Sequence, residues 1–422
     1  MHNKILSKFN KTKIQNLNNH FISINFLHRL FYIKKSELYH RGFSILPIGN
    51  LILLFLSFIT IVKCKILNVK IANYMIVHNG QLGKFDNRAK YILENINLKK
   101  NINIIRCTKF KDSIFAYLRY PNVILYFPLV FLNEPRFQRN FSSIKNYYNF
   151  RYKVEILNYK LFKKIFNFLK IKFFISIDDQ RTIQLFLKIC KDLNIYSIGY
   201  MHYKFSKFVI GIKYLTFDAF FVWSNYFFKK LCQVNKKYQQ SKIFYTGFYN
   251  KKFKKINTKE IIILYLMDSD VKLSDIKKII SIVIKNKNLR IFFKFKPQYT
   301  SLVEKKIINF LIKKRINYFR HESLDQINGK IKFDFFLASI STALLEAPLY
   351  GAIPLKLCNK NDFADDLILD KVVMPVKNIS SLSNIFKKKP RLKEVSTFKN
   401  KIWGLKKMKK EKLKKTLANL LK

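Results

Sequence analysis

The sequence is poor in acidic residues, in histidine and in cysteine. Its 422 residues include 25 Asp and Glu and 7 His against 81 Lys and Arg, which gives a formal net charge of +56. The cysteines form no Cys-x-x-Cys pair and have no histidine at metal-ligand spacing. The pair His321-Glu322 does not continue into a His-Glu-x-x-His motif. This argues against a zinc site or a disulfide framework and favours buried thiols in a reducing compartment. The five cysteines are Cys64, Cys107, Cys190, Cys232 and Cys358.

Long hydrophobic runs are also scarce. The stretch 43–62 contains no charge and is just long enough to span a membrane. Pro47, Gly49 and Asn50 interrupt it and leave a clean apolar run only from Leu51 to Val62. A run that short predicts a core helix or an interfacial segment, with a single span at 43–62 as the alternative. Residues 1–42 are basic with interspersed aromatic and aliphatic residues, so we expect 1–66 to be a helical extension that either lies on an anionic membrane surface or packs on the next domain.

What the sequence does contain is enough apolar material for a folded protein. Hydrophobic residues make up 49% and aromatic residues 16% of the chain, which excludes wholesale disorder. At this length two domains are expected. Part of the positive charge is a general bias towards Lys, Ile, Asn and Phe, but a surface this basic still attracts phospholipid headgroups, nucleic acid or phosphorylated substrates.

Residues 67–250 alternate between strand and helix patterns, which indicates a parallel sheet with crossover helices. The pattern repeats in 251–385. The first residues of this range, 251–259, form a charged segment that is typical of a linker. Strands are expected at KIANYMIV, NINIIRC, NVILYF, KIKFFISID, IYSIGYM, FDAFFVW and KIFYTGF, and then at EIIILYLM, LRIFFKF, INYF and FDFFLA. The fold class is therefore α/β with two Rossmann-like domains, followed by a basic helix over 386–422.

The segment Ala338–Leu355, ASISTALLEAPLYGAIPL, follows the last of these strand patterns. It places Ser339, Ser341 and Thr342 where a helix is expected to begin and sets Glu346 one turn further along. Hydroxyls and free N–H groups at a helix start favour phosphate, and a carboxylate can hold a sugar hydroxyl. An ordinary capped helix after a core strand explains the same pattern equally well.

Four stretches in this order resemble a GT-B type glycosyltransferase, in particular the bacterial surface and capsular polysaccharide transferases and the CDP-glycerol glycerophosphotransferases. They are GKFDNRAKYILENI, DDQRTIQLFLKICKDLNIYSIGYMHY, FFKFKPQ and SISTALLEAPLYGAIP, within residues 70–380. The last resembles the Ser-x-x-x-Glu-Ala-x-x-x-Gly-x-Pro donor motif of the family. His202 lacks the Gln and Gly that flank it in the family, and Lys296 stands where the family has a histidine.

The resemblance implies two Rossmann-like domains that face each other across a cleft, with the donor held by the C-terminal domain. It assigns His202, Asp178 and Asp179 as catalytic candidates, and Gly83 and Asn87 to an acceptor-side loop. Donor-binding candidates are Ser339, Ser341, Thr342, Glu346, Lys294, Lys296 and His321. A structural histidine, capping aspartates and surface lysines are the alternatives for these residues. No metal and no cofactor is implied, because the nucleotide-activated donor is itself a substrate.

The sequence therefore predicts a metal-independent glycosyltransferase that builds a capsule, lipopolysaccharide or teichoic-acid-like polymer. Its expected partners are a nucleotide-sugar donor, a lipid-linked or polysaccharide acceptor and an anionic membrane surface. We expect the protein to be cytoplasmic and peripheral on the inner face of the cell membrane. A polyol-phosphate transferase, a nucleotide-sugar epimerase and an inactive relative stay open. A nucleic-acid-binding protein is a further alternative that only the charge supports, since no helix-turn-helix or RNA-binding signature is present.

Overall fold

The computed structural model describes residues 47–66, 74–78, 102–106, 114, 117–118, 122–126, 156–176, 183–201, 212, 215–247, 259–267, 271–295, 302–339, 341–358, 365–404 and 410–421. The chain divides into two compact units, which are described separately below. The first takes in residues 1–223, 227–247 and 408–422, and the second takes in 224–226 and 248–407. Both units have an α/β fold, as expected.

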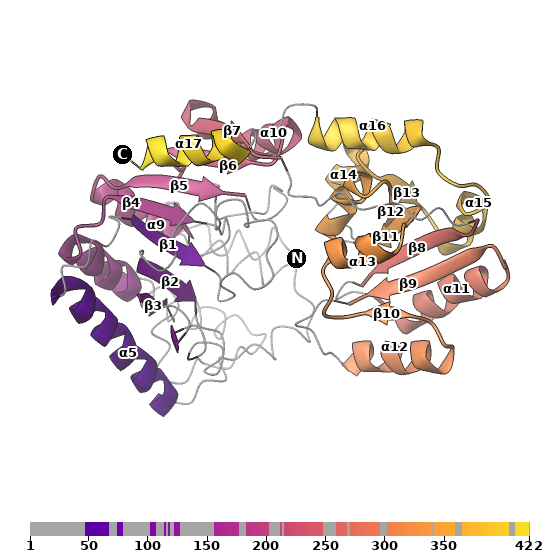
Figure 1. The fold of residues 1–422 in the computed structure, drawn as a ribbon, viewed down its shortest axis with the longest axis horizontal. Helices are drawn as coiled ribbons and strands as arrows, with labels where there is room; N and C mark the ends of the chain where they lie inside the picture. The colour runs from indigo at the N-terminus through magenta and orange to yellow at the C-terminus, as the bar shows by residue number, and fades with distance from the viewer. Residues whose placement is uncertain are drawn as a thin grey trace, which may run out of the picture. The chain divides into compact units, whose positions relative to one another are not determined.

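The first unit is built on a parallel sheet of seven strands (Figure 1). The strands run in the order β3-β2-β1-β4-β5-β6-β7, so the order reverses between β1 and β4. This is the doubly wound pattern of a Rossmann fold. The strands are β1 (Tyr74–His78), β2 (Ile102–Arg106), β3 (Val123–Tyr126), β4 (Phe173–Ser176), β5 (Tyr196–Tyr200), β6 (Ala219–Val222) and β7 (Lys242–Tyr245).

Helices of the first unit bury aromatic side chains against this sheet. Phe166 and Phe174 both lie close to Phe186, with ring centroids 6.0 and 5.6 Å apart, and all three are fully buried. Aromatic pairs of this kind add to the stability gained from apolar burial. The helices are α5 (Pro47–Ile66), a helix over 156–168, α9 (Ile183–Asp192), α10 (Asn225–Val234), the short 3-10 helix η2 (Lys236–Gln240) and α17 (Lys410–Leu420).

The second unit repeats the architecture with a parallel sheet of six strands in the order β10-β9-β8-β11-β12-β13. Its order reverses between β8 and β11. The strands are β8 (Ile261–Leu266), β9 (Leu289–Lys294), β10 (Tyr318–Phe319), β11 (Phe335–Ala338), β12 (Ile353–Leu357) and β13 (Met374–Val376). β8 is buried along its whole length, as expected for a central strand covered on both faces.

Two layers of helices and turns enclose the second sheet (Figure 1). Side chains such as Ile263 and Phe293 pack on one face against α11 and α12, whereas Phe292 and Phe336 pack on the other against Phe333 and Tyr350. The helices are α11 (Leu273–Ile284), α12 (Leu302–Lys313), α13 (Leu324–Lys330), η3 (Thr342–Leu345), η4 (Ala347–Leu349), α14 (Asp365–Leu369), η5 (Ile379–Ser381), α15 (Leu382–Ile385) and α16 (Leu392–Trp403).

Two expectations about the ends of the chain need correction. The basic tail at 386–422 contains two long helices, α16 and α17, because Gly404 adopts a φ of 61° and ends the first of them. At the other end, the helix is longer than the clean apolar run Leu51–Val62, because it begins at Pro47 and includes Gly49 and Asn50. Among the described helices, α5 included, none combines the length and apolar character needed to cross a membrane.

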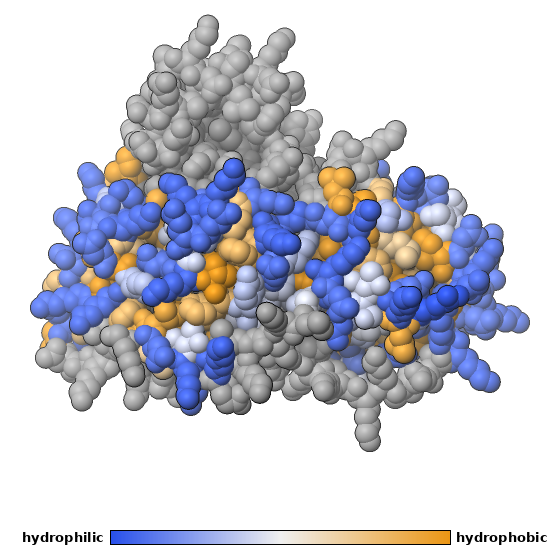
Figure 2. Space-filling model, turned by 90° about the horizontal axis from the view of Figure 1, so that it is seen from above, coloured by the Kyte–Doolittle hydropathy of each residue, from blue (hydrophilic) through white to orange (hydrophobic). Residues whose placement is uncertain are grey.

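The described surface is mainly hydrophilic on the face shown in Figure 2, with hydrophobic side chains in smaller groups between. Most lysines of the described segments are exposed, which follows from the cost of burying an unpaired ammonium group. The excess positive charge therefore lies where it can attract anionic partners.

Candidate functional site

The candidate donor site lies at the carboxyl edge of the second sheet. β8 and β11 are hydrogen-bonded neighbours, and β9 and β12 lie on opposite sides of this pair. Crossover connections from β8 and β11 therefore run in opposite directions, and ligands of open α/β sheets bind at the carboxyl ends of strands at such a reversal. β11 ends at Ala338, so Ser339, Ser341 and Thr342 follow directly at this position.

The segment after β11 is not the α-helix that the sequence predicts. It forms two short 3-10 helices, η3 and η4, linked at Glu346. Pro348 explains the difference, because its nitrogen cannot donate to the carbonyl of Leu344 and its ring would clash there. Ser341 precedes η3 without a side-chain capping bond within the described residues. Ser341 therefore does not begin an α-helix that could bind phosphate through its free N–H groups. The hydroxyl residues nevertheless follow the end of the strand, as predicted.

Glu346 and Thr342 are both buried, with 7% and 6% of their surface exposed. Neither of them is a solvent-exposed surface residue. Among the described residues, the Thr342 Oγ1 atom is buried without a hydrogen-bond partner. Because a buried, unsatisfied hydroxyl costs about 1–3 kcal/mol, such a group beyond the end of a central strand is a candidate for contact with a ligand.

Side chains from two helices hold this segment in place. The indole Nε1 of Trp403 in α16 donates to the carbonyl of Leu345 at 2.8 Å. The hydroxyl of Tyr350 donates to the carboxylate of Asp325 in α13 at 2.9 Å, and its ring stacks on Phe336. The backbone around Glu346 is thus fixed by contacts on both sides, which is the preorganisation that a binding site needs.

Lys294, at the end of β9, is engaged by its own unit. Its ammonium group donates to the carbonyl of Phe295 at 2.5 Å and to that of Arg320 at 2.9 Å. Burial lowers the pKa of Lys294 to about 8. Lys294 therefore braces the loop after β10, and a role in holding phosphate would have to use the remaining N–H.

The pKa of Lys294 leads to a prediction for stability. Below pH 8 the folded and unfolded chains both carry this proton, whereas between pH 8 and 10.5 only the unfolded chain binds it. The free energy of unfolding of the wild type, minus that of Lys294→Met, should therefore rise with pH across this window. Urea titrations of both proteins from pH 6 to 10 measure it. A difference that stays constant with pH would show that burial does not perturb this lysine.

The loop that Lys294 braces contains His321, which is exposed. Glu322 stabilises the loop by accepting hydrogen bonds from the backbone N–H groups of Arg320 and His321, both at 3.1 Å. Hydrogen bonds from its own backbone N–H and from these two hold the pKa of Glu322 below its usual value. Ser323 and Gln326 then form a capping box at the start of α13. His321 is thereby presented at the carboxyl end of β10.

The other candidates lie outside the described residues. These are His202, Asp178 and Asp179, the acceptor-loop residues Gly83 and Asn87, and Lys296. β4 ends at Ser176 and β5 at Tyr200, so the first three follow the carboxyl ends of neighbouring strands in the chain. Their roles stay predictions.

The sequence analysis missed Lys356, in the middle of the second sheet. This residue of β12 is fully buried and lies beside Ala338 of β11 in the strand register. Burial of an ammonium group is tolerated only with compensating contacts, and Lys356 has such contacts. The sequence feature that could have revealed this buried lysine is its place as the single charge within the apolar run IPLKL, directly after the donor-like motif.

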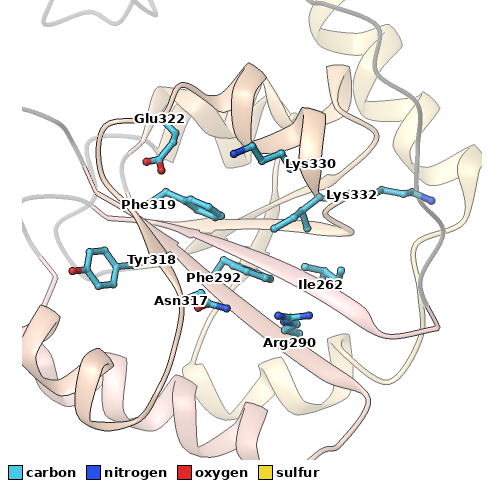
Figure 3. A pocket seen from close by; sticks show the side chains of 10 residues that line it. Ile262, Arg290, Phe292, Asn317, Tyr318, Phe319, Glu322, Lys330 and Lys332 are labelled. Atoms are coloured by element: carbon cyan, nitrogen blue, oxygen red, sulfur yellow. The ribbon is translucent and has the colours of Figure 1, made fainter.

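A cavity of about 480 Å³ lies elsewhere, on the face of the second sheet near β10 (Figure 3). Its walls come from β8, β9, the segment 317–322 and the end of α13, and they include Arg290, Phe292 and Lys332. None of the predicted donor-binding residues in the described part of the chain lines it. Within that same part, no cluster of three or more His, Cys, Asp or Glu side chains could hold a metal ion.

No protein-family model and no curated protein matches the sequence. Solved structures do match. MnaA from S. aureus, in a co-structure with UDP, is 11% identical, with 82% of this chain and 94% of that chain covered and a TM-score of 0.53. A UDP-glucosyltransferase from Polygonum tinctorium is 8% identical, with 82% and 98% covered and a TM-score of 0.54. A putative UDP-N-acetylglucosamine 2-epimerase from Listeria monocytogenes is 10% identical, with 82% and 94% covered and a TM-score of 0.51.

At this level of identity the similarity shows the fold alone. The chain has two parallel α/β units and matches these structures over most of its length. It therefore has the GT-B glycosyltransferase-like fold that the order of its sequence motifs predicts.

Proposed function

We propose that the chain is a glycosyltransferase that uses a nucleotide-activated donor to build a cell-surface polysaccharide. The observation that carries this proposal is the fixed segment after β11, which brings the buried Glu346 and Thr342 together with Ser339 at the point where the strand order reverses. Ligands of Rossmann-like domains bind at this point. The capsule, lipopolysaccharide and teichoic-acid-like polymers are the candidate products, as in the transferases that the motifs resemble.

In the proposed mechanism the second unit binds the donor. Glu346 accepts a hydrogen bond from a ribose hydroxyl, while Ser339, Ser341 and Thr342 donate to the phosphates. Lys296 and His321 supply positive charge, and Lys294 positions the loop of His321. These hydrogen bonds and charges stabilise the leaving phosphate without a metal ion.

Acceptor activation is assigned to the first unit. His202, with Asp178 and Asp179 as alternatives, takes the proton from the acceptor hydroxyl. The hydroxyl oxygen then forms a bond to the anomeric carbon, and the bond from that carbon to the phosphate oxygen breaks with its electron pair going to the nucleoside diphosphate. Gly83 and Asn87 contribute to the acceptor-side loop. The acceptor is lipid-linked or polysaccharide, at the inner face of an anionic membrane.

A nucleotide-sugar epimerase is the second candidate, because one of the matching structures is a putative UDP-N-acetylglucosamine 2-epimerase. The two candidates differ in one requirement. An epimerase converts its sugar nucleotide without an acceptor, whereas a transferase, including a polyol-phosphate transferase, releases nucleotide only when an acceptor is present. Incubation of the purified protein with sugar nucleotides, with and without acceptor, separates them.

The proposal predicts stabilisation by one nucleoside phosphate. At a concentration of about 100 times its Kd, the matching nucleotide should add about 2.7 kcal/mol to the stability of the unit that binds it. For a unit of this size that corresponds to an increase in Tm of roughly 5–10 °C. Differential scanning fluorimetry with UDP, GDP, CDP and CMP measures the shift.

Pyrophosphate is the control for general attraction of anions to this basic chain. If pyrophosphate stabilises the protein as much as every nucleotide does, the site recognises charge alone and the proposal is wrong. Thr342→Val should reduce the shift, since it removes the unsatisfied hydroxyl while it preserves the volume of the side chain. Ser383→Ala, on the short helix α15, serves as the matched loss of a hydroxyl outside the site.

A further inference from the structure

Several large apolar side chains of helix α5 lie on its outer side. It packs against β3 at the edge of the first sheet, with Ser57, Thr60 and Cys64 buried. The hydroxyl of Thr60 is satisfied locally by the carbonyl of Leu56 at 3.1 Å. By contrast, Phe55 and Phe58 are 63% and 62% exposed. A helix that only served the core would show the reverse arrangement, with its apolar stripe turned inwards.

The helix over 156–168 lies next to the end of α5 and continues this surface. The ammonium group of Lys65 donates to the carbonyl of Phe168 at 3.3 Å and lies 4.8 Å from the centre of its ring. Leu157, Leu161 and Phe168 are exposed, whereas Phe166 is buried against the core. The three exposed residues are four and seven positions apart, so they form one stripe on the outer side of the helix.

The charged side chains of these two helices are all basic, and Asp192 of α9 pairs with one of them, Lys163, at 3.7 Å. Exposed lysines accompany the apolar side chains, among them Lys63 in α5 and Lys160 and Lys164 in the second helix. Residues 47–66 and 156–170 contain no Asp or Glu. A second copy of the chain would bring like charges together at this surface. An anionic lipid bilayer offers both an apolar interior for the phenylalanines and phosphates for the lysines.

We propose that α5 and the helix over 156–168 dock the first unit onto an anionic lipid surface. The outward phenylalanine, isoleucine and leucine side chains insert at the boundary between headgroups and acyl chains, and the lysines beside them contact lipid phosphates. This docking goes beyond the proposed reaction and does not depend on it. Where the reaction is as proposed, the docking places the acceptor unit beside a lipid-linked acceptor.

Vesicle flotation of the full chain tests the proposal. Wild-type protein should float with vesicles of phosphatidylcholine that contain about one third phosphatidylglycerol, and much less with phosphatidylcholine alone. The double variant F55Q/F58Q should lose about tenfold or more of this binding, because two apolar anchors are removed. The matched control is L302Q/L392Q in the second unit, whose residues are 77% and 81% exposed and whose binding should not change.

A fluorescence measurement distinguishes insertion from simple attraction of charge. Phe58→Trp should show a blue-shifted emission when anionic vesicles are added, whereas Leu302→Trp should not. The native Trp223 and Trp403 are buried, with 1% and 6% exposed, and contribute a constant background. The proposal is overturned if F55Q/F58Q floats like the wild type or if Phe58→Trp shows no shift. It is equally overturned if light scattering shows a dimer that F55Q/F58Q abolishes while vesicle binding persists.

Discussion

Glu346→Gln should lower the kcat/KM for a nucleotide-activated donor about 100-fold while the protein stays folded. Glu346 is buried, with 7% of its surface exposed. The substitution keeps the volume of this side chain but removes its negative charge. Hydrogen bonds to charged groups contribute about 1.5–3 kcal/mol, and this amount corresponds to a factor of roughly 10 to 150. Initial rates of nucleotide release in the presence of acceptor, measured across donor concentrations, give the change.

The matched control is Glu260→Gln, at the start of β8 and therefore at the opposite end of the sheet from the site. The Glu260 side chain is 44% exposed and forms an ion pair with Arg290 that is 4.0 Å long, so its replacement should leave turnover unchanged. Glu346→Ala is the less informative variant, because it would also leave a cavity beside Leu345 and Ala347. Full activity of Glu346→Gln would remove this carboxylate from donor recognition.

Much of the fold could be predicted because central strands of parallel sheets are continuous apolar runs. All eleven strand patterns of the sequence correspond to strands, β1 to β11. β12 was missed because Pro354 and Lys356 interrupt its apolar pattern, and proline is usually confined to edge strands. Neighbouring strands override these local signals, since β11 pairs with β12 along its length. Tertiary pairing is not visible in one sequence.

The candidate site was predictable in its location but not in its local structure. The hydroxyls and Glu346 follow a strand at the sheet edge, as the motif indicates, whereas the two 3-10 helices depend on Pro348. The contacts of Lys294 with two carbonyls join residues that are up to 26 positions apart. The carbonyl of Leu345 is likewise held by Trp403, which comes 58 positions later in the chain. Sequence spacing gives the order of such residues, but only the packing decides which of them remain available for a ligand.

The largest loss of stability should come from Gly199→Ala. Gly199 lies in β5 between Ser176 of β4 and Phe220 of β6, and an added Cβ atom would overlap the ring of Phe220 and lie 2.7 Å from Cδ2 of Phe217. Both rings are buried to at least 99% and pack on each other with centroids 5.3 Å apart, so neither can move freely. Overpacking of a tight core typically costs about 1–3 kcal/mol, and an overlap this close should place Gly199→Ala at the upper end of that range. A decrease in Tm of roughly 10 °C in thermal unfolding is expected.

A double-mutant cycle shows whether the overlap with Phe220 is the cause. Phe220→Leu alone should be destabilising, because it removes buried ring atoms, but in the Gly199→Ala background it should cost less or even restore stability. Strictly additive losses would contradict the steric explanation. The result also bears on catalysis, since β5 ends at Tyr200 and leads to the proposed base His202. Displacement of β5 by an added methyl group should therefore reduce turnover in the fraction of Gly199→Ala that remains folded, and Phe220→Leu should recover stability and turnover together.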